Sequence, residues 1–143
     1  MLISRTKPAQ KKYQAKALAT QAFGKEAFGK STKTTLRWLG MAGFLINSRG
    51  TTIMVDPLLE GFDMPILIEF PILAKDVPHV DAVFVTHADN DHFSVPTNVA
   101  MSKAVDVYHS TVYVDSLMKN LKLKSVGHDI GDMFKVKNIS VRL

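Results

Sequence analysis

The sequence predicts an α+β protein built from short strands and a few short helices. Residues 35–56 contain three closely spaced β-rich runs, LRWLG, GFLINS and TTIMVD, which are typical of an antiparallel meander. Residues 82–86 (AVFVT) are a continuous apolar run of strand length, which indicates a strand buried on both faces. Further along, apolar residues spaced i, i+3, i+4 and i+7 mark one face of a helix: Val114, Leu117, Met118 and Leu121.

The composition limits the kinds of site that the chain can build. Its 143 residues, 46% hydrophobic and 22% charged, are typical of one soluble globular unit. Cysteine is absent, which excludes a disulfide scaffold, a thiolate zinc finger, an iron–sulfur centre and a cysteine nucleophile. No apolar run approaches the ~18 residues of a membrane-crossing helix, and the start lacks the ~7 to 15 residue apolar stretch of a secretory signal. We therefore expect a cytoplasmic location and no membrane partner.

Residues 1–34 are expected to form a basic helix and linker ahead of a main unit at residues 35–143. The first 35 residues carry a net charge of +7, whereas the rest carries −2. Residues 10–23 fit an amphipathic helix, and residues 24–35 (GKEAFGKSTKTT) fit a linker. We expect the apolar face of this helix to pack against the body or a partner chain: Ala15, Leu18, Ala19, Ala22 and Phe23. Nucleic-acid binding by the basic arm and a transit-peptide role are less favoured alternatives.

The next elements can be placed in order along the chain. Arg49-Gly50 joins the second and third runs of the meander. Residues 57–80 hold four prolines at a spacing that no helix or central strand tolerates, so we expect a long loop. The buried strand at 82–86 leads into THADNDHFS, after which Ser94 or Thr97 could cap a short helix toward Met101.

The C-terminal third is expected to add a strand, a helix and a hairpin. Residues 104–108 (AVDVY) fit a strand, and Ser110 would cap the helix that follows it. Residues 133–143 (MFKVKNISVRL) alternate like a hairpin whose turn lies near Lys137-Asn138, and the chain ends within the second strand.

The clearest chemical signal is His87-Ala88-Asp89-Asn90-Asp91-His92, directly after the buried strand. Two imidazoles and two carboxylates in one turn are a donor set for a divalent metal. A polar turn that bonds its own backbone is the alternative, and the two flanking histidines argue against it. A calcium loop is excluded, because counting from Asp89 leaves apolar residues at the ligand positions. His109 and His128 are interpreted as surface or hydrogen-bonded histidines and not as ligands.

THADNDH resembles the His-x-His-x-Asp-His motif of the metallo-β-lactamase-fold hydrolases. The segment LRWLGMAGFLINSRGTTIMVDP is similar to the opening strands of the ascorbate-phosphate lactonase branch of that superfamily. Gly131-Asp132 followed by KVKNISV resembles the hairpin that precedes the next metal-binding histidine of the family. The resemblance covers residues 35–143 and implies an αββα sandwich, of which this chain would form only the N-terminal β-layer with its helices.

The resemblance also implies a set of site residues. His87 and Asp89 would hold a first metal ion, and Asp91 and His92 a second, with zinc as the expected metal and manganese as the alternative. Asp91 would also orient the attacking hydroxide and accept its proton. Asp56, at the end of the third run, would hold the loop backbone or a ligand imidazole from outside the metal shell.

Two features of the chain depart from the family pattern. Asp89 stands where the family has a histidine, and Met41 stands where many relatives have one. The later metal ligands of the family lie beyond Leu143. Because catalytic zinc sites generally use three protein ligands, we expect the 143-residue chain to be a poor or inactive hydrolase. The bare apolar face of one β-layer further predicts self-association or a missing C-terminal half.

The leading functional hypothesis is a metal-dependent hydrolase acting on a small-molecule ester, lactone or phosphoester. A metal-activated hydroxide would be the nucleophile. The alternative is a non-catalytic remnant that binds metal weakly or not at all. Nucleic-acid processing through the basic arm is less favoured, because residues 35–143 show no basic groove interleaved with aromatic residues.

Overall fold

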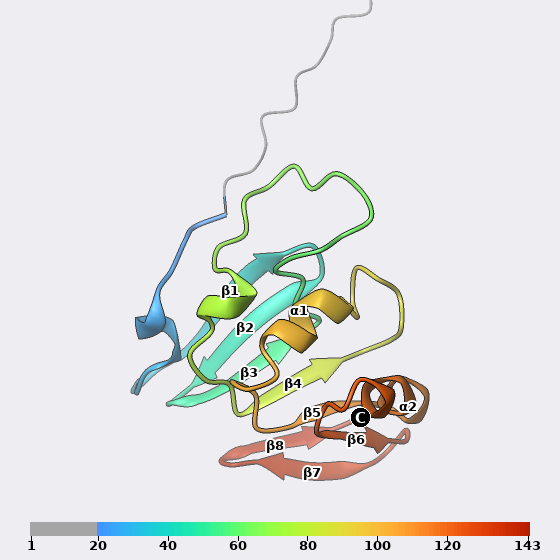
Figure 1. The fold of residues 1–143 in the computed structure, drawn as a ribbon. Coiled ribbons are helices and arrows are strands. Elements are labelled where there is room, and N and C mark those ends of the chain that lie inside the picture. Colours follow the sequence, from blue (N-terminus) through green and yellow to red (C-terminus); the bar gives the residue numbers. More distant parts are fainter. Residues whose placement is uncertain (1–19) are drawn as a thin grey trace, which may run out of the picture.

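The computed structural model describes residues 20–143, which contain a six-stranded mixed sheet (Figure 1). Its strands lie side by side in chain order: β1 Thr34–Gly40, β2 Gly43–Ser48, β3 Thr51–Val55, β4 Ala82–Val85, β5 Tyr108–Thr111 and β6 Ser125–His128. The first three strands pair antiparallel, and β3 to β6 pair parallel. Short helices follow β4 and β5, and a hairpin follows β6: α1 Val95–Ala100, α2 Val112–Asn120, β7 Met133–Val136 and β8 Ile139–Arg142.

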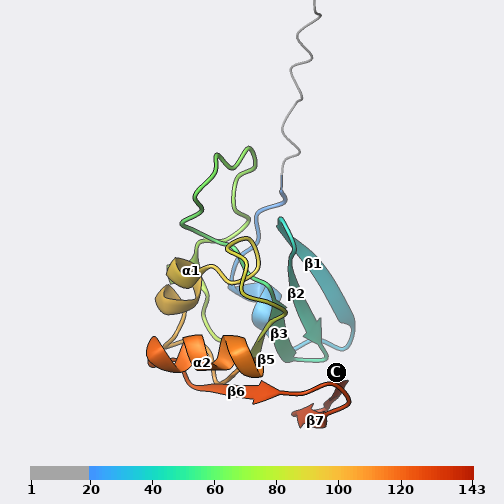
Figure 2. The same ribbon diagram turned by 90° about the vertical axis from the view of Figure 1, so that its right-hand side faces the viewer.

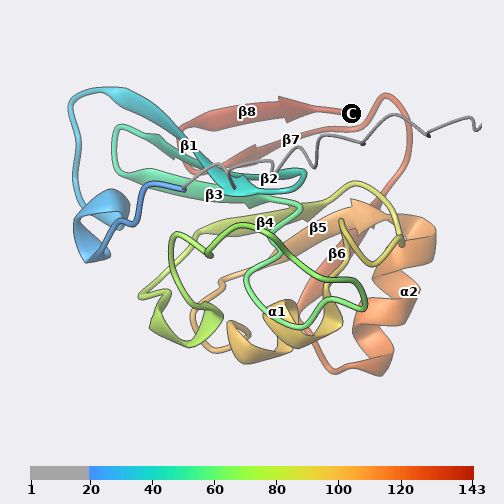
Figure 3. The same cartoon turned by 90° about the horizontal axis from the view of Figure 1, so that it is seen from above.

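The elements form three layers. Figure 3 shows α1 and α2 on one face of the sheet and the β7–β8 hairpin on the other, and Figure 2 shows the helices from the side. Met54 and Val83 belong to the core on the helix side, whereas Ile53 and Ala82 pack with the hairpin. Central strands that are covered on both faces need apolar residues at successive positions, which explains the continuous apolar runs of β3 and β4.

The predicted meander and the predicted long loop are both confirmed. Arg49 and Gly50 connect β2 to β3 with φ values of 54° and 91°. Positive φ at both positions belongs to the two-residue turn whose twist matches that of paired strands. Between residues 57 and 80 the one regular element is a single 3-10 turn, η2 Ala74–Asp76.

The buried strand expected at 82–86 is the interior strand β4, between β3 and β5. Val83 is 0% exposed and Val85 is 2% exposed, as predicted. After the polar loop, Ser94 accepts a hydrogen bond from the Thr97 backbone N–H and caps α1, which the sequence also predicted. The polar loop is therefore fixed by the core on one side and by a capped helix on the other.

The predicted C-terminal hairpin is confirmed, with Lys137 and Asn138 at its turn. This turn is fastened to the sheet by an ion pair between the Lys137 ammonium and Asp81 (Nζ to Oδ1, 2.5 Å) and by a hydrogen bond between Thr51 and Asn138. Burial alone would raise the pKa of Asp81. The nearby Lys137 and the Thr52 N–H outweigh burial, so that this pKa lies below its ordinary value and the carboxylate stays ionised.

The boundaries predicted for the strand and the helix around β5 were wrong. Residues 104–107 are not a strand: they contribute an isolated bridge between Val80 and Val105, and β5 begins only at Tyr108. Ser110 does not cap α2, because its backbone is paired with Val85 of β4, and Thr111 is the cap instead. Pairing with β4 sets these boundaries, and residues 104–111 alone do not reveal where that pairing starts.

The segment expected to be a linker is packed on the domain. Residues Lys25–Phe28 form the 3-10 turn η1, and Ala27 is buried in the core. The Asn47 side-chain amide donates hydrogen bonds to the carbonyls of Ala27 (2.9 Å) and Gly29 (2.8 Å). Most of the helix expected at residues 10–23 lies outside the described residues, and residues 20–24 are not helical. Within residues 20–143, no helix has the length and apolar content needed to cross a membrane.

We expect the substitution Met54→Ala to lower the free energy of unfolding by about 2 to 5 kcal/mol, because it opens a cavity between the sheet and the helices. Urea unfolding monitored by circular dichroism measures this loss. The control Met64→Ala removes the same side chain from an exposed loop position and should leave stability within about 0.5 kcal/mol of the parent. Equal effects of the two substitutions would contradict the assignment of Met54 to the core.

Candidate functional site

The candidate site is the loop at residues 86–93, which follows the carboxyl end of β4. Ligand sites of open parallel sheets lie at this end of the strands. The loop turns back on itself because the backbone N–H groups of His92 and Phe93 both donate to the carbonyl of Asp89, at 2.9 Å and 2.7 Å. The Phe93 side chain is buried in the core and anchors the turn. Polar side chains of the loop are therefore held at the carboxyl end of β4.

Asp56 connects the end of β3 to this loop. Its backbone is in the left-handed region (φ 43°), which Asp tolerates better than most residues, and the residue is 3% exposed. One carboxylate oxygen accepts a hydrogen bond from the Thr86 backbone N–H (2.8 Å), and the other accepts one from the Thr86 hydroxyl (2.7 Å). The second oxygen also lies 2.8 Å from Nδ1 of His92. Asp56 thus lies beside the loop and holds both its backbone and one imidazole.

These contacts define which ring nitrogen of each histidine carries the proton. A carboxylate only accepts, so Nδ1 of His92 is the donor to Asp56. The Thr86 hydroxyl gives its single proton to Asp56, so it accepts from Nδ1 of His87, 3.0 Å away. In the neutral form of both rings, Nε2 then keeps its lone pair and is free to bind a cation. Thr86 was not singled out in the sequence; a hydroxyl directly between a buried strand and a histidine is the signal that could have indicated it.

The four predicted ligands are brought together as two pairs. Nε2 of His87 lies 3.3 Å from Oδ2 of Asp89, and Nε2 of His92 lies 3.5 Å from Oδ2 of Asp91. The two imidazole rings contact each other, with their centroids 3.8 Å apart. Within residues 20–143, however, these four do not supply a trio of ligand atoms that all lie within 4.8 Å of one another. The one trio that does is His79, Asp81 and Asp106, at the opposite ends of the strands.

Each His–Asp pair has the spacing of two ligands on one ion. With bonds of ~2.1 Å from the metal, two ligands of a tetrahedral ion lie about 3.4 Å apart. The observed 3.3 Å and 3.5 Å agree with that separation. Imidazole nitrogen and carboxylate oxygen together suit zinc and manganese. The residues present therefore fit a divalent metal.

His109 and His128 form a separate, hydrogen-bonded pair. Nδ1 of His109 lies 2.8 Å from Nε2 of His128, and the His109 ring stacks on Phe84 and Phe134. Burial, with a smaller contribution from His128, lowers the pKa of His109 to about 4. The interpretation of these two residues as hydrogen-bonded histidines is confirmed. They line a cavity of about 570 Å³ that reaches Thr86 at the start of the loop.

The described domain matches a known family and has curated relatives. Residues 35–142 match the model of a family described as Beta-lactamase superfamily domain. A UPF0173 metal-dependent hydrolase from Myxococcus xanthus (strain DK1622) is 31% identical over 136 residues, which cover 90% of this chain and 46% of that protein. The chain thus spans less than half the length of this relative.

Two solved structures share the fold. One is CmlA, a diiron beta-hydroxylase from Streptomyces venezuelae, with a TM-score of 0.58 and 20% identity over 74% of this chain and 22% of that chain. Another is Igni18, a metallo hydrolase from the hyperthermophilic archaeon Ignicoccus hospitalis, with a TM-score of 0.53 and 20% identity over 75% of this chain and 44% of that chain. At 20% sequence identity the similarity to these two structures is a similarity of fold. That fold agrees with the α+β architecture expected from the sequence.

We expect Asp56→Asn to lower the free energy of unfolding by about 1 to 3 kcal/mol, because charged hydrogen bonds to Thr86 and His92 are lost. With the amide NH2 facing His92, the proton of that ring should move from Nδ1 to Nε2, which 15N NMR of the imidazole reports directly. The control Thr86→Ser keeps the hydroxyl and should keep the His92 tautomer. An unchanged tautomer in Asp56→Asn would contradict the assigned direction of this hydrogen bond.

The buried His109 should make stability depend on pH below neutrality. Its pKa is about 4 in the folded chain and near 6.5 in the unfolded chain, so the unfolded state binds more protons between these values. Stability should therefore fall as the pH drops from 6.5 to 4, by up to about 3 kcal/mol from this group. Urea unfolding at several pH values should show that His109→Gln removes this part of the slope. The exposed control His87→Gln should retain it, and equal slopes for His109→Gln and the parent would refute the assignment.

Proposed function

Because the chain belongs to the Beta-lactamase superfamily domain family, we propose that it is a metal-dependent hydrolase whose metal site is the loop after β4. The observation that carries the proposal is the Asp56–Thr86 network, which occupies Nδ1 of His87 and of His92 and leaves each Nε2 beside a carboxylate. The relative from Myxococcus xanthus is itself named a metal-dependent hydrolase, which supports the same reaction class.

The proposed site follows the two pairs seen in the structure. His87 with Asp89 would hold one ion, and Asp91 with His92 would hold a second, as zinc or as manganese. When bound, such a metal lowers the pKa of a coordinated water and polarises a carbonyl or phosphoryl oxygen. Because Asp89 offers oxygen where the family has imidazole nitrogen, the first pair should favour a harder cation than a two-histidine pair would.

The other residues of the site have positioning and proton-holding roles in this proposal. Asp56 fixes the ring orientation of His92, and Thr86 fixes that of His87. Asp91 is half-exposed, with one carboxylate oxygen near His92, and we assign to it acceptance of the proton lost by the attacking water. The cavity that begins at Thr86 would accommodate the apolar part of a small substrate.

The substrate class remains the one suggested by the sequence: a small-molecule ester, lactone or phosphoester. The lactonase-like resemblance of residues 36–57 supports a lactone within that class. The proposal includes a cytoplasmic location, for which the absence of cysteine is the support. It also includes weak turnover by the 143-residue chain, because each pair supplies two ligands and catalytic zinc sites use three.

Metal binding without turnover is the second candidate function. It is favoured by the spacing within the loop, where no three of the four ligand residues present atoms within 4.8 Å of one another among the residues described. Purified chain with zinc or manganese, assayed on lactone and phosphodiester substrates, separates the two candidates. Metal-dependent turnover that His92→Ala abolishes supports the hydrolase, whereas binding without turnover supports the second candidate.

Restoring the family motif gives the sharper test of the metal site. We expect Asp89→His to tighten zinc binding about tenfold or more, because a second imidazole replaces the weaker carboxylate donor beside His87. Isothermal titration calorimetry with zinc measures the change. The control Asn90→His adds an imidazole at a neighbouring position outside the two pairs and should leave affinity unchanged. If both substitutions tighten binding equally, position 89 is not a ligand position and the proposed site is wrong.

A further inference from the structure

A second polar cluster lies at the amino ends of β4 and β5. The candidate site lies at the other, carboxyl end of β4. His79 and Asp81 immediately precede β4, and Asp106 precedes β5. The two approaching segments are held side by side by hydrogen bonds from Val80 N–H to the Ala104 carbonyl (2.8 Å) and from Asp106 N–H to the Val80 carbonyl (3.0 Å). Parallel pairing therefore brings these three side chains to one place.

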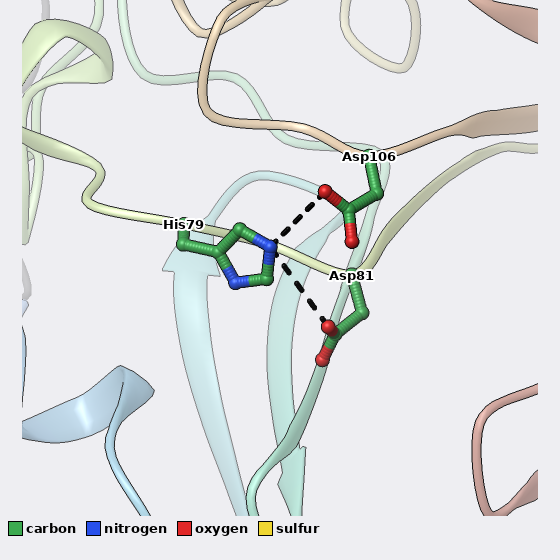
Figure 4. A group of neighbouring side chains, drawn as sticks. All are labelled: His79, Asp81 and Asp106. Carbon is green, nitrogen blue, oxygen red and sulfur yellow. Dashed lines mark ion pairs between the residues drawn. The ribbon is translucent and has the colours of Figure 1, made fainter.

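The side chains of the cluster point toward a common centre. In Figure 4 the imidazole of His79 lies between the carboxylates of Asp81 and Asp106. Its Nε2 lies 3.2 Å from Oδ1 of Asp106 and 3.9 Å from Oδ1 of Asp81. One ligand atom from each residue can be chosen so that all three lie within 4.8 Å of one another. With bonds of ~2.1 Å, ligands around one ion are separated by about 3 to 4 Å, so small side-chain adjustments suffice.

Asp81 supplies an independent indication that a cation belongs here. The residue is 4% exposed, and its Oδ2 accepts hydrogen bonds from the Thr52 backbone N–H (2.7 Å) and hydroxyl (3.3 Å). Its Oδ1 is buried and accepts no well-aligned hydrogen bond. The nearest cationic group to that oxygen is the Lys137 ammonium, 2.5 Å away, whose side chain is 58% exposed. The buried Oδ1 of Asp81 thus faces His79, and its counter-ion is the ammonium of a largely exposed lysine, which another cation can replace.

We propose that His79, Asp81 and Asp106 form a binding site for a divalent metal ion, in which the metal takes the place that the Lys137 ammonium occupies on Asp81. One imidazole and two carboxylates are a donor set for zinc or manganese. A divalent ion carries twice the charge of the ammonium and contacts three ligands at once, whereas Lys137 must order a long side chain to make one contact. Lys137 and the metal therefore compete for Oδ1 of Asp81.

This site is independent of the proposed hydrolase site. The cluster and the loop at residues 86–93 lie at opposite ends of the same strand, β4. None of its three residues contacts Asp56, Thr86, His87 or His92 through any hydrogen bond or ion pair of the described residues. The inference consequently stands or falls without reference to the reaction proposed above.

The test is a titration of the full chain with Zn²⁺, followed by NMR signals of the His79 imidazole and of the His87 and His92 imidazoles. We expect the His79 signals to shift with added Zn²⁺ irrespective of occupancy at the loop. Asp106→Asn should weaken the binding seen at His79 about tenfold or more, because it removes one of three ligands from an exposed position without touching the core. Asp76→Asn, which changes another exposed aspartate three residues before His79, should leave it unchanged.

A substitution of Lys137 should change the affinity for Zn²⁺ in the opposite direction. Lys137→Met removes the charge and keeps a long side chain, so Zn²⁺ should bind at His79 about thirtyfold more tightly, the effect of one unit charge on a divalent ion at roughly 4 Å in water. Lys135→Met, in the same hairpin, is the matched control. The metal site is refuted if Zn²⁺ shifts only the His87 and His92 signals, or if Asp106→Asn binds like the parent. Unchanged or weaker binding in Lys137→Met overturns the competition between Lys137 and the metal.

Discussion

The carboxylate of Asp56 is the group on which the candidate site depends. It is buried, and an isolated buried carboxylate would be strongly unfavourable. Three donors compensate it: the backbone N–H and the hydroxyl of Thr86, and Nδ1 of His92. All three belong to the segment after β4, whereas Asp56 belongs to the end of β3. The same contacts therefore close the edge between two parallel strands and orient the rings that would bind a metal. Asp56 makes these contacts from a left-handed backbone conformation, directly before Pro57.

Strand β4 connects two polar clusters through a rigid apolar segment. Asp81 stands at one end and Thr86 with His87 at the other, and Val83 and Val85 between them are fully enclosed. At roughly 3.3 Å per residue, the two clusters lie about 20 Å apart. Charges at that distance are largely screened from each other at physiological ionic strength. Each carboxylate must therefore be compensated locally: Asp56 by the donors of Thr86 and His92, and Asp81 by Lys137 and His79.

The features that the sequence predicted correctly are those with a local cause. The meander, the buried strand, the Ser94 cap and the Lys137-Asn138 turn each follow from a few consecutive residues, and the resemblance of THADNDH to the metallo-β-lactamase-fold motif led to the family that the comparisons support. What the sequence did not indicate depends on distant partners. The start of β5 is set by pairing with β4, and the role of Thr86 requires Asp56, thirty positions away. The cluster of His79, Asp81 and Asp106 becomes visible only once the strands are in register.

The mixed sheet also has a consequence for how the chain folds. β1, β2 and β3 are joined by tight turns, so their pairing needs only local closure and can form on the microsecond timescale of hairpins. Pairing of β3 with β4 must instead close the whole proline-containing segment 56–81. This closure loses more chain entropy, and the loss comes before the contacts that compensate it have formed. The meander is thus suited to act as a template onto which the parallel strands are added in turn. The network around Asp56 joins the two strands that meet in this slow step, so the histidines can acquire their fixed orientation only once β4 has paired with β3.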